Sequence, residues 1–406
     1  MLWTLAWRNV WRNRRRSVLT LATILLAVVL GLLMRSMQYG SYDAMIGSTV
    51  ARGGHIQVHG EGYWDNKSID RSIHADPATL DQIRSATSVI DVVPRLESFA
   101  LISFGDRTKP SAVVGTDPVV EDRYTSLADR VVEGEYLAEG ERGILLLRGL
   151  ADYLGAEVGD EVVLLGAGYR GQTAADLLPV TGIFDLVMMG NLETGMAYMP
   201  LAAARELYAA PPDQVTSLSV MLDDGETVQT TADTLAEMLG AEYEVMTWRE
   251  TSKEVVQQIQ SDSAGGIFML GILYMVAGFG LLGTVLMSTM ERRREFGVMN
   301  AVGLRRSRLA TVLFIETVAL VVVGVVLGLI VSLPIMYWFH LHPIPVSGDL
   351  VTVFEEFNIP PYIPFALNPG IFVAQGFVVL VMALVVASFP IVSIRRLNIM
   401  RAIAGR

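Results

Sequence analysis

The residues best suited to recognising another protein stand in a short polar stretch, 291–308, between two long apolar runs. Glu291 and Glu295 are four residues apart, so on a helix they share one face beside Arg292 and Arg294. The apolar and glycine positions among these charges are Phe296, Gly297, Val298, Met299, Ala301, Val302 and Gly303. A short helix with charged sides and an apolar centre predicts docking on a protein. A basic loop that only sets orientation would explain the arginines, but not the apolar residues.

Other motifs in the chain do not predict chemistry. The glycines at 278, 280 and 283 match G-x-G-x-x-G, but the dinucleotide fingerprint needs a preceding strand and these lie in an apolar run. The three lysines are Lys67, Lys109 and Lys253, and none follows a glycine. The chain therefore has no P-loop of the Walker-A type. We expect it to hold no cofactor and not to be an enzyme.

Metal and nucleophilic sites are equally weakly indicated. His55 and His59 are four residues apart, without carboxylates at metal-ligand spacing, so surface or core histidines are favoured over a metal site. No nucleophile–base pair is recognisable. The chain has no cysteine, which excludes disulfide scaffolds and cysteine-ligated metal centres. We expect no catalytic residue, no metal and no nucleic-acid partner.

The composition indicates a membrane protein. Hydrophobic residues make up 52% of the 406 residues and charged residues only 18%, against about 25% in a soluble domain. A membrane helix needs about 20 mainly apolar residues. Four stretches meet this length, and we expect transmembrane helices at 17–38, 263–290, 309–336 and 369–394. The first lacks a small-x-small cleavage site and is therefore expected to remain uncleaved.

The distribution of charge predicts the topology. The segment 39–262 carries a net charge of −21, whereas 1–16, 291–308 and 395–406 are rich in arginine. The outer loop 337–368 has no lysine or arginine. Because positive loops stay inside, both termini and 291–308 are expected in the cytoplasm. The fold class is then four transmembrane helices with a large α+β extracytoplasmic domain inserted between helices 1 and 2.

Residues 1–16 and the outer domain each have a recognisable pattern. Trp3, Trp7 and Trp11 recur every four residues, which predicts a cytoplasmic helix lying in the membrane interface; a short basic tail is the alternative. In the outer domain, we expect strands at 55–58, 99–104, 112–114, 161–165, 180–184, 196–199, 218–222 and 244–247, with helices at 77–85, 145–154, 201–208 and 227–239. These suggest two lobes, a base (43–100 and 215–260) and an inserted lobe (105–210).

Two features concern the membrane helices. No Pro or Gly interrupts 249–264, so we expect the helix that begins near Trp248 to run without a break into the second span. Gly324 and Gly328 form a GxxxG pair in the third span, which predicts a face where another helix packs closely.

The stretch 291–303 resembles a known signature, E-x-x-x-E-[aromatic]-G-[V/I]-[M/L]-x-A-[V/L]-G, followed by a glutamate in the next helix. Here that glutamate is Glu316. The pattern is similar to the coupling helix of the FtsX/MacB group of ABC-transporter permeases, whose layout covers the whole chain. Outer segments at 114–118, 132–137, 154–161, 180–184 and 354–361 resemble the lipoprotein-releasing permeases of that group. The N-terminal segment resembles the general MacB-like permeases more closely.

The resemblance implies a mechanism with several partners. The permease would form a homo- or heterodimer and dock on a separate ABC ATPase dimer, which holds the ATP and magnesium. The 291–303 helix would receive the ATPase motion. A periplasmic lipoprotein carrier or adaptor and membrane lipid are further expected partners. The cell inner membrane is the expected location.

Two groups of residues extend this expectation. Apolar residues near the outer ends of the first two spans, with one arginine, are candidate cargo-lining positions: Val28, Leu32, Arg35, Ile267, Leu270, Ile272 and Leu273. Their apolar character also suits any lipid-facing helix, and Arg35 could equally snorkel to the membrane surface. Glu316 lies inside the third span, where an ionisable residue usually pairs inward, so we expect it to brace the coupling helix with Arg305 or Arg306.

Three classes of function are compatible with the sequence. The first is a transporter that extracts lipoproteins or similar amphiphiles from the outer leaflet. The second is a mechanotransmitter that drives an efflux adaptor or a cell-wall hydrolase without transport. The third, a passive receptor or adhesion domain, is disfavoured by the coupling helix.

Overall fold

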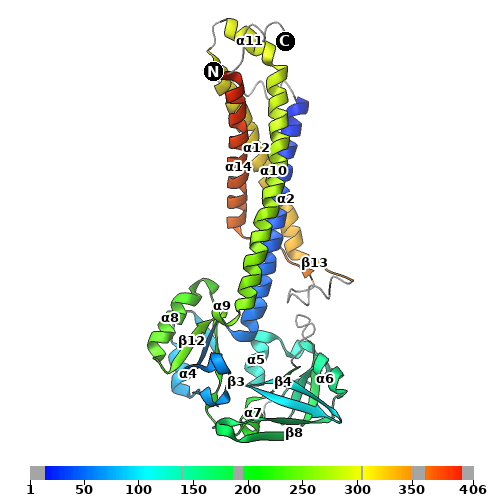
Figure 1. The fold of residues 1–406 in the computed structure, drawn as a ribbon, viewed down its shortest axis with the longest axis vertical. Helices are drawn as coiled ribbons and strands as arrows, with labels where there is room; N and C mark the ends of the chain where they lie inside the picture. The colour runs from blue at the N-terminus through cyan, green and yellow to red at the C-terminus, as the bar shows by residue number, and fades with distance from the viewer. Residues whose placement is uncertain are drawn as a thin grey trace. The chain divides into compact units, whose positions relative to one another are not determined.

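The computed structural model describes residues 14–138, 140–185, 195–302, 305–348, 351 and 362–395. These residues form two compact units, drawn in Figure 1. Unit 1 comprises the described residues up to 43, 259–345 and those from 362 onward, and unit 2 comprises 44–258 with the described residues of 346–361. The expected interfacial helix at 1–16 and the tail at 395–406 lie almost entirely outside the described residues.

Unit 1 contains the four expected apolar helices, except for residues 44–53 of the first and 253–258 of the second, which belong to unit 2. They are α2 (Arg14–Gly53), α10 (Lys253–Glu291), α12 (Arg306–Leu341) and α14 (Pro369–Arg395), with the short α11 (Arg293–Ala301) between the second and third. Each is long and apolar enough to cross a membrane. A helix satisfies its own backbone hydrogen bonds, so such sequences adopt this form in lipid. A two-residue strand pair, β13 (Ile344–Pro345) and β14 (Tyr362–Ile363), follows α12.

The core of unit 1 is formed by side chains from all four helices. Ile24 and Val28 of α2 are at most 1% exposed. A Cβ atom at Gly324 would lie 2.9 Å from Ile24, and one at Gly328 would lie 2.7 Å from Val28. The expected GxxxG face is therefore present on α12, and it packs against α2.

A polar cluster joins α2 to α10 within unit 1. Tyr42 Oη donates to Asp262 Oδ2 over 2.7 Å. Gln38 Nε2 donates to the same carboxylate oxygen and to the Asp262 carbonyl, each over 3.0 Å. Gln38 Oε1 in turn accepts from Arg35 Nη1 over 2.9 Å. A Cβ at Gly266 would lie 2.2 Å from Gln38 Nε2, so a larger residue there would displace the Gln38 amide from these contacts.

Unit 2 is built on a ten-stranded mixed sheet. Its strands are β1 (Ile56–Gly60), β3 (Val89–Phe104), β4 (Arg107–Thr116), β5 (Val131–Gly134), β6 (Ile144–Leu147), β7 (Glu161–Ala167), β8 (Thr173–Phe184), β9 (Gly195–Pro200), β11 (Ser217–Leu222) and β12 (Tyr243–Thr247). The order is β12-β1-β11-β3-β4-β9-β6-β8-β5, and β7 pairs with β3 and β8. The pairs β4–β9 and β6–β8 are parallel, and the others are antiparallel. A separate pair joins β2 (Ile73–His74) to β10 (Gln214–Val215).

Short helices accompany this sheet. They are α3 (Tyr63–Asn66), α4 (Pro77–Arg84), α5 (Pro118–Thr125), α6 (Arg148–Leu154), α7 (Leu201–Leu207), α8 (Val228–Leu239) and α9 (Trp248–Thr251), with 3-10 turns at Ile69–Arg71, Ala128–Arg130, Tyr169–Gly171 and Gly225–Thr227. Two helix starts follow directly from Asp-Pro pairs. The carboxylates of Asp76 and Asp117 accept backbone N–H groups of the first turn, and the proline supplies a pre-set φ.

Two apolar cores lie along the one sheet. One gathers Ile69 and residues between 96 and 208, and the other gathers residues of 50–92 and 215–248. These ranges lie close to the two expected lobes. The lobes are not separate layers, however, because β3 places Val92 in one core and Leu96 in the other. Figure 1 shows α4 and α8 near β12, and α6 and α7 near β4 and β8.

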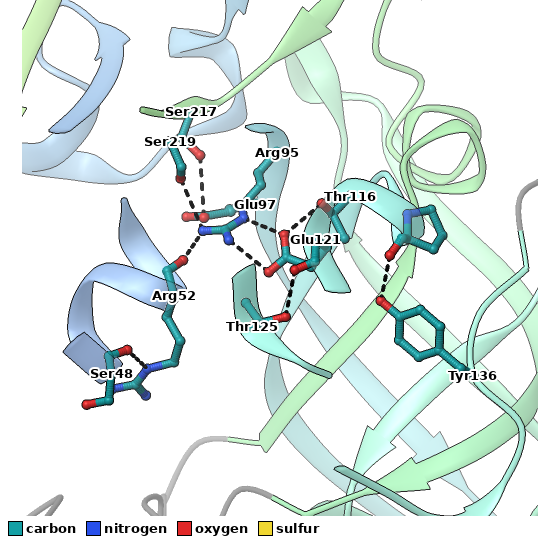
Figure 2. Close-up of polar contacts among 11 residues, drawn as sticks. Ser48, Arg52, Arg95, Glu97, Thr116, Glu121, Thr125, Tyr136, Ser217 and Ser219 are labelled. Atoms are coloured by element: carbon teal, nitrogen blue, oxygen red, sulfur yellow. Dashed lines mark hydrogen bonds and ion pairs between the residues drawn. The ribbon is translucent and has the colours of Figure 1, made fainter. Parts of the chain in front are cut away.

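A buried ion pair holds the end of α2 within unit 2 (Figure 2). Arg95 Nη2 and Nε each donate to the Glu121 carboxylate over 2.8 Å. Arg95 Nη1 donates to the Arg52 carbonyl and to Ser219 Oγ. Glu121 is completely buried and also accepts from Thr116 Oγ1. Arg95 therefore caps the carbonyl end of α2, where cations are favoured.

The electrostatics of this pair follow from its burial. Removal from water by itself lowers the pKa of the Arg95 guanidinium, but the adjacent Glu121 carboxylate raises it above the ordinary value. The Arg95 guanidinium therefore stays charged inside the domain.

Three details differ from the sequence expectations. Residues 144–147 form the buried strand β6, and the helix expected at 145–154 begins only at Arg148, because a short apolar run fits a strand as well as a helix. The first helix continues through Gly53, beyond the expected end at 38. The helix that begins at Trp248 is interrupted at Ser252, whose φ of −120° and ψ of 57° are not helical, and a second helix starts at Lys253.

Candidate functional site

The candidate docking element is α11, which lies between two of the apolar helices in unit 1. Chain direction changes at Arg292, after α10 ends at Glu291. Helix α11 then spans Arg293–Ala301, and α12 begins at Arg306. At the start of α11, an acidic residue, Glu295, occupies the first turn, where the helix dipole favours negative charge.

Arg292 fixes α11 to its neighbours. Its Nη1 donates to Glu316 Oε2 of α12 over 2.8 Å, and its Nε donates to Glu295 Oε2 of α11 over 3.4 Å. The side chains of Arg292 and Glu316 are each 12% exposed. One guanidinium thus contacts carboxylates from two helices, and its planar donors suit such paired contacts.

Among the described side chains, Glu316 pairs with an arginine other than the two that we expected. We expected Arg305 or Arg306. Arg305 is exposed and stands at the start of α12, and the Arg306 side chain lies outside the described residues. Glu316 contacts Arg292 at the start of the α11 segment, 24 residues earlier in the sequence, and its role as a brace stays a prediction.

The apolar residues of α11 divide into covered and exposed positions. Gly297 is buried and Met299 is half-buried, whereas Val298 is 52% exposed and Val302 is 80% exposed. Glu291, Arg294 and Glu295 are exposed. The side chains of Phe296 and Ala301, and Gly303 as a whole, lie outside the described residues. The segment thus presents valines to solvent beside charged side chains, which suits a protein-docking surface.

The candidate cargo-lining residues lie partly in the core of unit 1 and partly beside a pocket. Val28 and Leu32 are fully buried in the core of unit 1, so within one chain they line no open space. Three of the others, Arg35, Ile267 and Leu270, border a pocket between α2, α10 and α14. Ile272 is 48% exposed and Leu273 is half-buried, and neither borders that pocket.

Sequence reasoning missed the polar contacts that position these helices. Besides the cluster of Gln38, Tyr42 and Asp262, Tyr274 Oη donates to Gln375 Oε1 over 2.6 Å between α10 and α14. A glutamine inside an apolar span was the available signal for such a contact.

His55 and His59 have structural partners in unit 2. His55 Nδ1 accepts the backbone N–H of Leu222 over 3.1 Å. His59 Nδ1 lies 3.0 Å from the Thr216 carbonyl oxygen, which can only accept, so Nδ1 carries the proton. Burial lowers the pKa of each imidazole. Within the described ranges, no three His, Asp or Glu side chains gather as a metal site would require.

Comparison with known families matches most of the chain. Residues 17–238 match the model of the MacB-like periplasmic core domain, which is more than half of the chain. Residues 267–399 match the model of the FtsX-like permease C-terminal domain.

Individual relatives are distant. The lipoprotein-releasing system transmembrane protein LolC of Xylella fastidiosa strain 9a5c is 24% identical over 250 residues, which cover 60% of this chain and 59% of LolC. The corresponding protein LolE of Haemophilus influenzae is 24% identical, covering 68% of this chain and 69% of LolE. The pyoverdine export ATP-binding/permease protein PvdT of Pseudomonas fluorescens Pf-5 is 26% identical over 87% of this chain and 54% of PvdT. The chain thus spans about three fifths of the LolC relative.

These matches agree with the residues that carried the resemblance. The 291–303 segment and Glu316 lie inside the FtsX-like match, and most of the ten-stranded sheet lies inside the MacB-like match. Together with four apolar helices, they indicate a protein of the inner membrane. The chain belongs to the FtsX/MacB family of ABC-transporter permeases.

Proposed function

We propose that this chain is the non-catalytic membrane subunit of an ABC system that extracts lipoproteins or similar amphiphiles from the outer leaflet. It works as a homo- or heterodimer with a separate ATPase dimer, which binds the ATP and magnesium. Both termini lie in the cytoplasm, as the arginine-rich flanks favour. The relatives named for lipoprotein release support this class of cargo.

The observation that carries the proposal is the attachment of α11. Arg292 links this short helix to Glu316 of α12, while Val298 and Val302 remain exposed. A partner that pushes on the exposed valines would therefore move α12 as well as α11. Closure of the ATPase dimer supplies such a push.

In this proposal the cargo contacts an exposed face of α10, together with the second permease subunit. On α10, large apolar side chains recur at helical spacing on one exposed face: Phe268, Met269, Ile272, Met275, Val276 and Phe279. Flexible methionines suit a surface that adapts to acyl chains of different length. Ile267 and Ile272 of the expected cargo set lie on exposed parts of this helix.

A mechanotransmitter is the second candidate. Val28 and Leu32, which were expected to line a cargo path, are fully buried, and this favours a chain that transmits motion without transport. The match of 17–238 to a MacB-like core domain supports the same alternative. The external partner would then be an efflux adaptor or a cell-wall hydrolase.

The test is the composition of the native complex, isolated in lipid nanodiscs and identified by mass spectrometry. An ATPase with acylated lipoproteins supports extraction. An ATPase with only a soluble external partner supports mechanotransmission. Absence of an ATPase contradicts the role given to α11.

A matched pair of variants tests α11 itself. Val298→Asp places a charge on the docking surface and should abolish ATPase capture, whereas Val119→Asp, at a 62% exposed valine of α5, should leave capture unchanged. Equal capture by both variants would remove α11 from the ATPase interface.

A further inference from the structure

A pocket of about 590 Å³ opens between α2, α10 and α14 of unit 1. Pockets of this size accommodate drug-sized ligands. Ile267 and Leu270 of α10 form one wall, and Ile371 and Val378 of α14 form the other. Because the residues on each helix are spaced by one or two turns, the pocket runs along the helices as an apolar groove.

Gly271 keeps this groove open. It borders the pocket, and a Cβ atom built on it would meet no atom within 4 Å. A side chain can therefore begin at this border of the pocket without meeting a neighbouring atom at its Cβ. Tyr274 and Gln375, joined by their hydrogen bond, border the same space.

A cation borders this apolar groove. Arg35 donates to Gln38, and its guanidinium carbon lies 5.8 Å from the centre of the Tyr39 ring. Among the described residues, no carboxylate forms an ion pair with Arg35. The first residues of α14 also border the pocket at Gly370, so the positive end of that helix adds to the charge of Arg35. An arginine in a membrane helix without a carboxylate partner requires another anion or water.

Two apolar residues at the border of the pocket are exposed. Ile267 is 58% exposed and Val378 is 42% exposed, although both border the groove. On a helix that crosses a membrane, the molecules that reach such an opening are lipids. A lipid combines the two features of the pocket, since its acyl chain suits the groove and its phosphate suits Arg35.

We propose that this pocket binds one phospholipid, with an acyl chain between α10 and α14 and the phosphate at Arg35. A free phosphate ion would satisfy the arginine but would leave the apolar groove empty. Lipid binding here does not depend on ATPase coupling or on the nature of the cargo. The site is therefore a binding site for the membrane itself, distinct from the exposed face of α10.

The experiment uses the full-length chain in nanodiscs, without the ATPase and without lipoproteins. A phosphatidylglycerol that carries a photoreactive diazirine in its acyl chain is cross-linked, and the labelled peptides are mapped. We expect labels, assigned residue by residue, at the pocket positions Leu270 and Tyr274 of α10 and Ile371 and Gln375 of α14. Labels confined to the exposed face of α10 would overturn the proposal.

Two glycine variants on one helix form a matched pair. Gly271→Leu fills the pocket and should abolish labelling there. Gly283→Leu makes the same change on α10 outside the pocket, at another glycine with no atom within 4 Å of a built Cβ, and should leave labelling unchanged. Equal labelling in both variants would show that the acyl chain lies elsewhere.

The role of Arg35 is tested with two probes. Arg35→Gln should weaken phosphatidylglycerol labelling about tenfold, because a charge-assisted hydrogen bond contributes about 1.5 kcal/mol or more. Labelling by a diacylglycerol probe, which has no phosphate, should not change. Equal loss with both probes would contradict a phosphate at Arg35. Displacement of the label by a synthetic lipopeptide, but not by unlabelled phospholipid, would assign the pocket to cargo and overturn the proposal.

Discussion

The guanidinium of Arg292 and the carboxylate of Glu316 lie 2.8 Å apart, although 24 residues separate them. This contact joins the start of α11 to α12 across the whole docking segment. Both side chains are largely covered. Breaking this ion pair should therefore cost more than breaking an exposed pair and less than breaking a fully buried one. The strength of this ion pair determines how firmly a push on α11 is transmitted.

The first prediction concerns Glu316. Glu316→Gln keeps an acceptor for Arg292 and should retain most of the ATPase stimulation. Glu316→Leu removes this acceptor and should lower the free energy of unfolding by about 2 kcal/mol. ATPase stimulation and thermal unfolding of the assembled complex measure the two effects. Equal loss of stimulation in both variants would instead indicate a role that depends on the charge.

The second prediction concerns the buried pair that caps α2. Glu121→Leu leaves the Arg95 guanidinium buried and unpaired, and should cost about 3–5 kcal/mol of unfolding free energy. The double variant Arg95→Leu with Glu121→Leu should recover part of this loss. Arg123→Ala breaks the more exposed pair with Asp91 and should cost less than about 1 kcal/mol. Chemical denaturation of the full chain measures all three, and similar losses for Glu121→Leu and Arg123→Ala would contradict the expectation.

The third prediction concerns the contact between α12 and α2. Gly328→Val introduces a Cβ only 2.7 Å from that of Val28, inside a closely packed region, and should destabilise the helices by about 1–3 kcal/mol. Gly283→Val, at an open position on α10, serves as the control and should be tolerated. Thermal unfolding in nanodiscs compares them. If Gly328→Val is as stable as the control, α2 and α12 do not pack as described.

The fourth prediction concerns pH. Burial lowers the pKa of His59 below its ordinary value of 6.5, so the unfolded chain takes up a proton that the folded chain does not. Stability is therefore fully present above about pH 6.5 and decreases as the pH falls below it. Hydrogen exchange of β1 and β11 amides, corrected for intrinsic rates, measures this loss.

Two histidine variants are the controls for this pH effect. His59→Asn keeps a donor near the Thr216 carbonyl without titrating, and should reduce the pH dependence. His74→Asn, at a histidine whose side chain is 64% exposed, should leave it unchanged. An unchanged pH dependence in His59→Asn would assign the effect to other groups.

The sequence was sufficient for the features that follow from simple periodicity. Four apolar helices could be predicted because a membrane span requires about 20 apolar residues. The GxxxG pair indicated a packing face, which the structure places against Ile24 and Val28. The helix expected at 77–85 is present as α4, which begins at Pro77.

Other features depend on contacts between distant residues. Nothing in the sequence distinguishes Arg292 from Arg305 as the partner of Glu316, because the choice depends on how the α11 turn folds. The run Ile144–Leu147 fits a strand or a helix, and only its neighbours in the sheet decide between them. The capping box of Thr247 and Glu250 marks the start of α9, but no glycine or proline explains why that helix ends at Ser252.

The long strand β3 restricts how the outer domain can deform. Its sixteen residues contribute to both apolar cores without interruption, and its backbone is hydrogen-bonded to β11 at one end and to β4 and β7 at the other. The two ladders meet at Arg95, next to Pro94, which has no N–H to donate. At this junction only β3 itself continues from one core to the other, so a bend of the outer domain between its cores is confined to the residue whose side chain binds Glu121 and the Arg52 carbonyl.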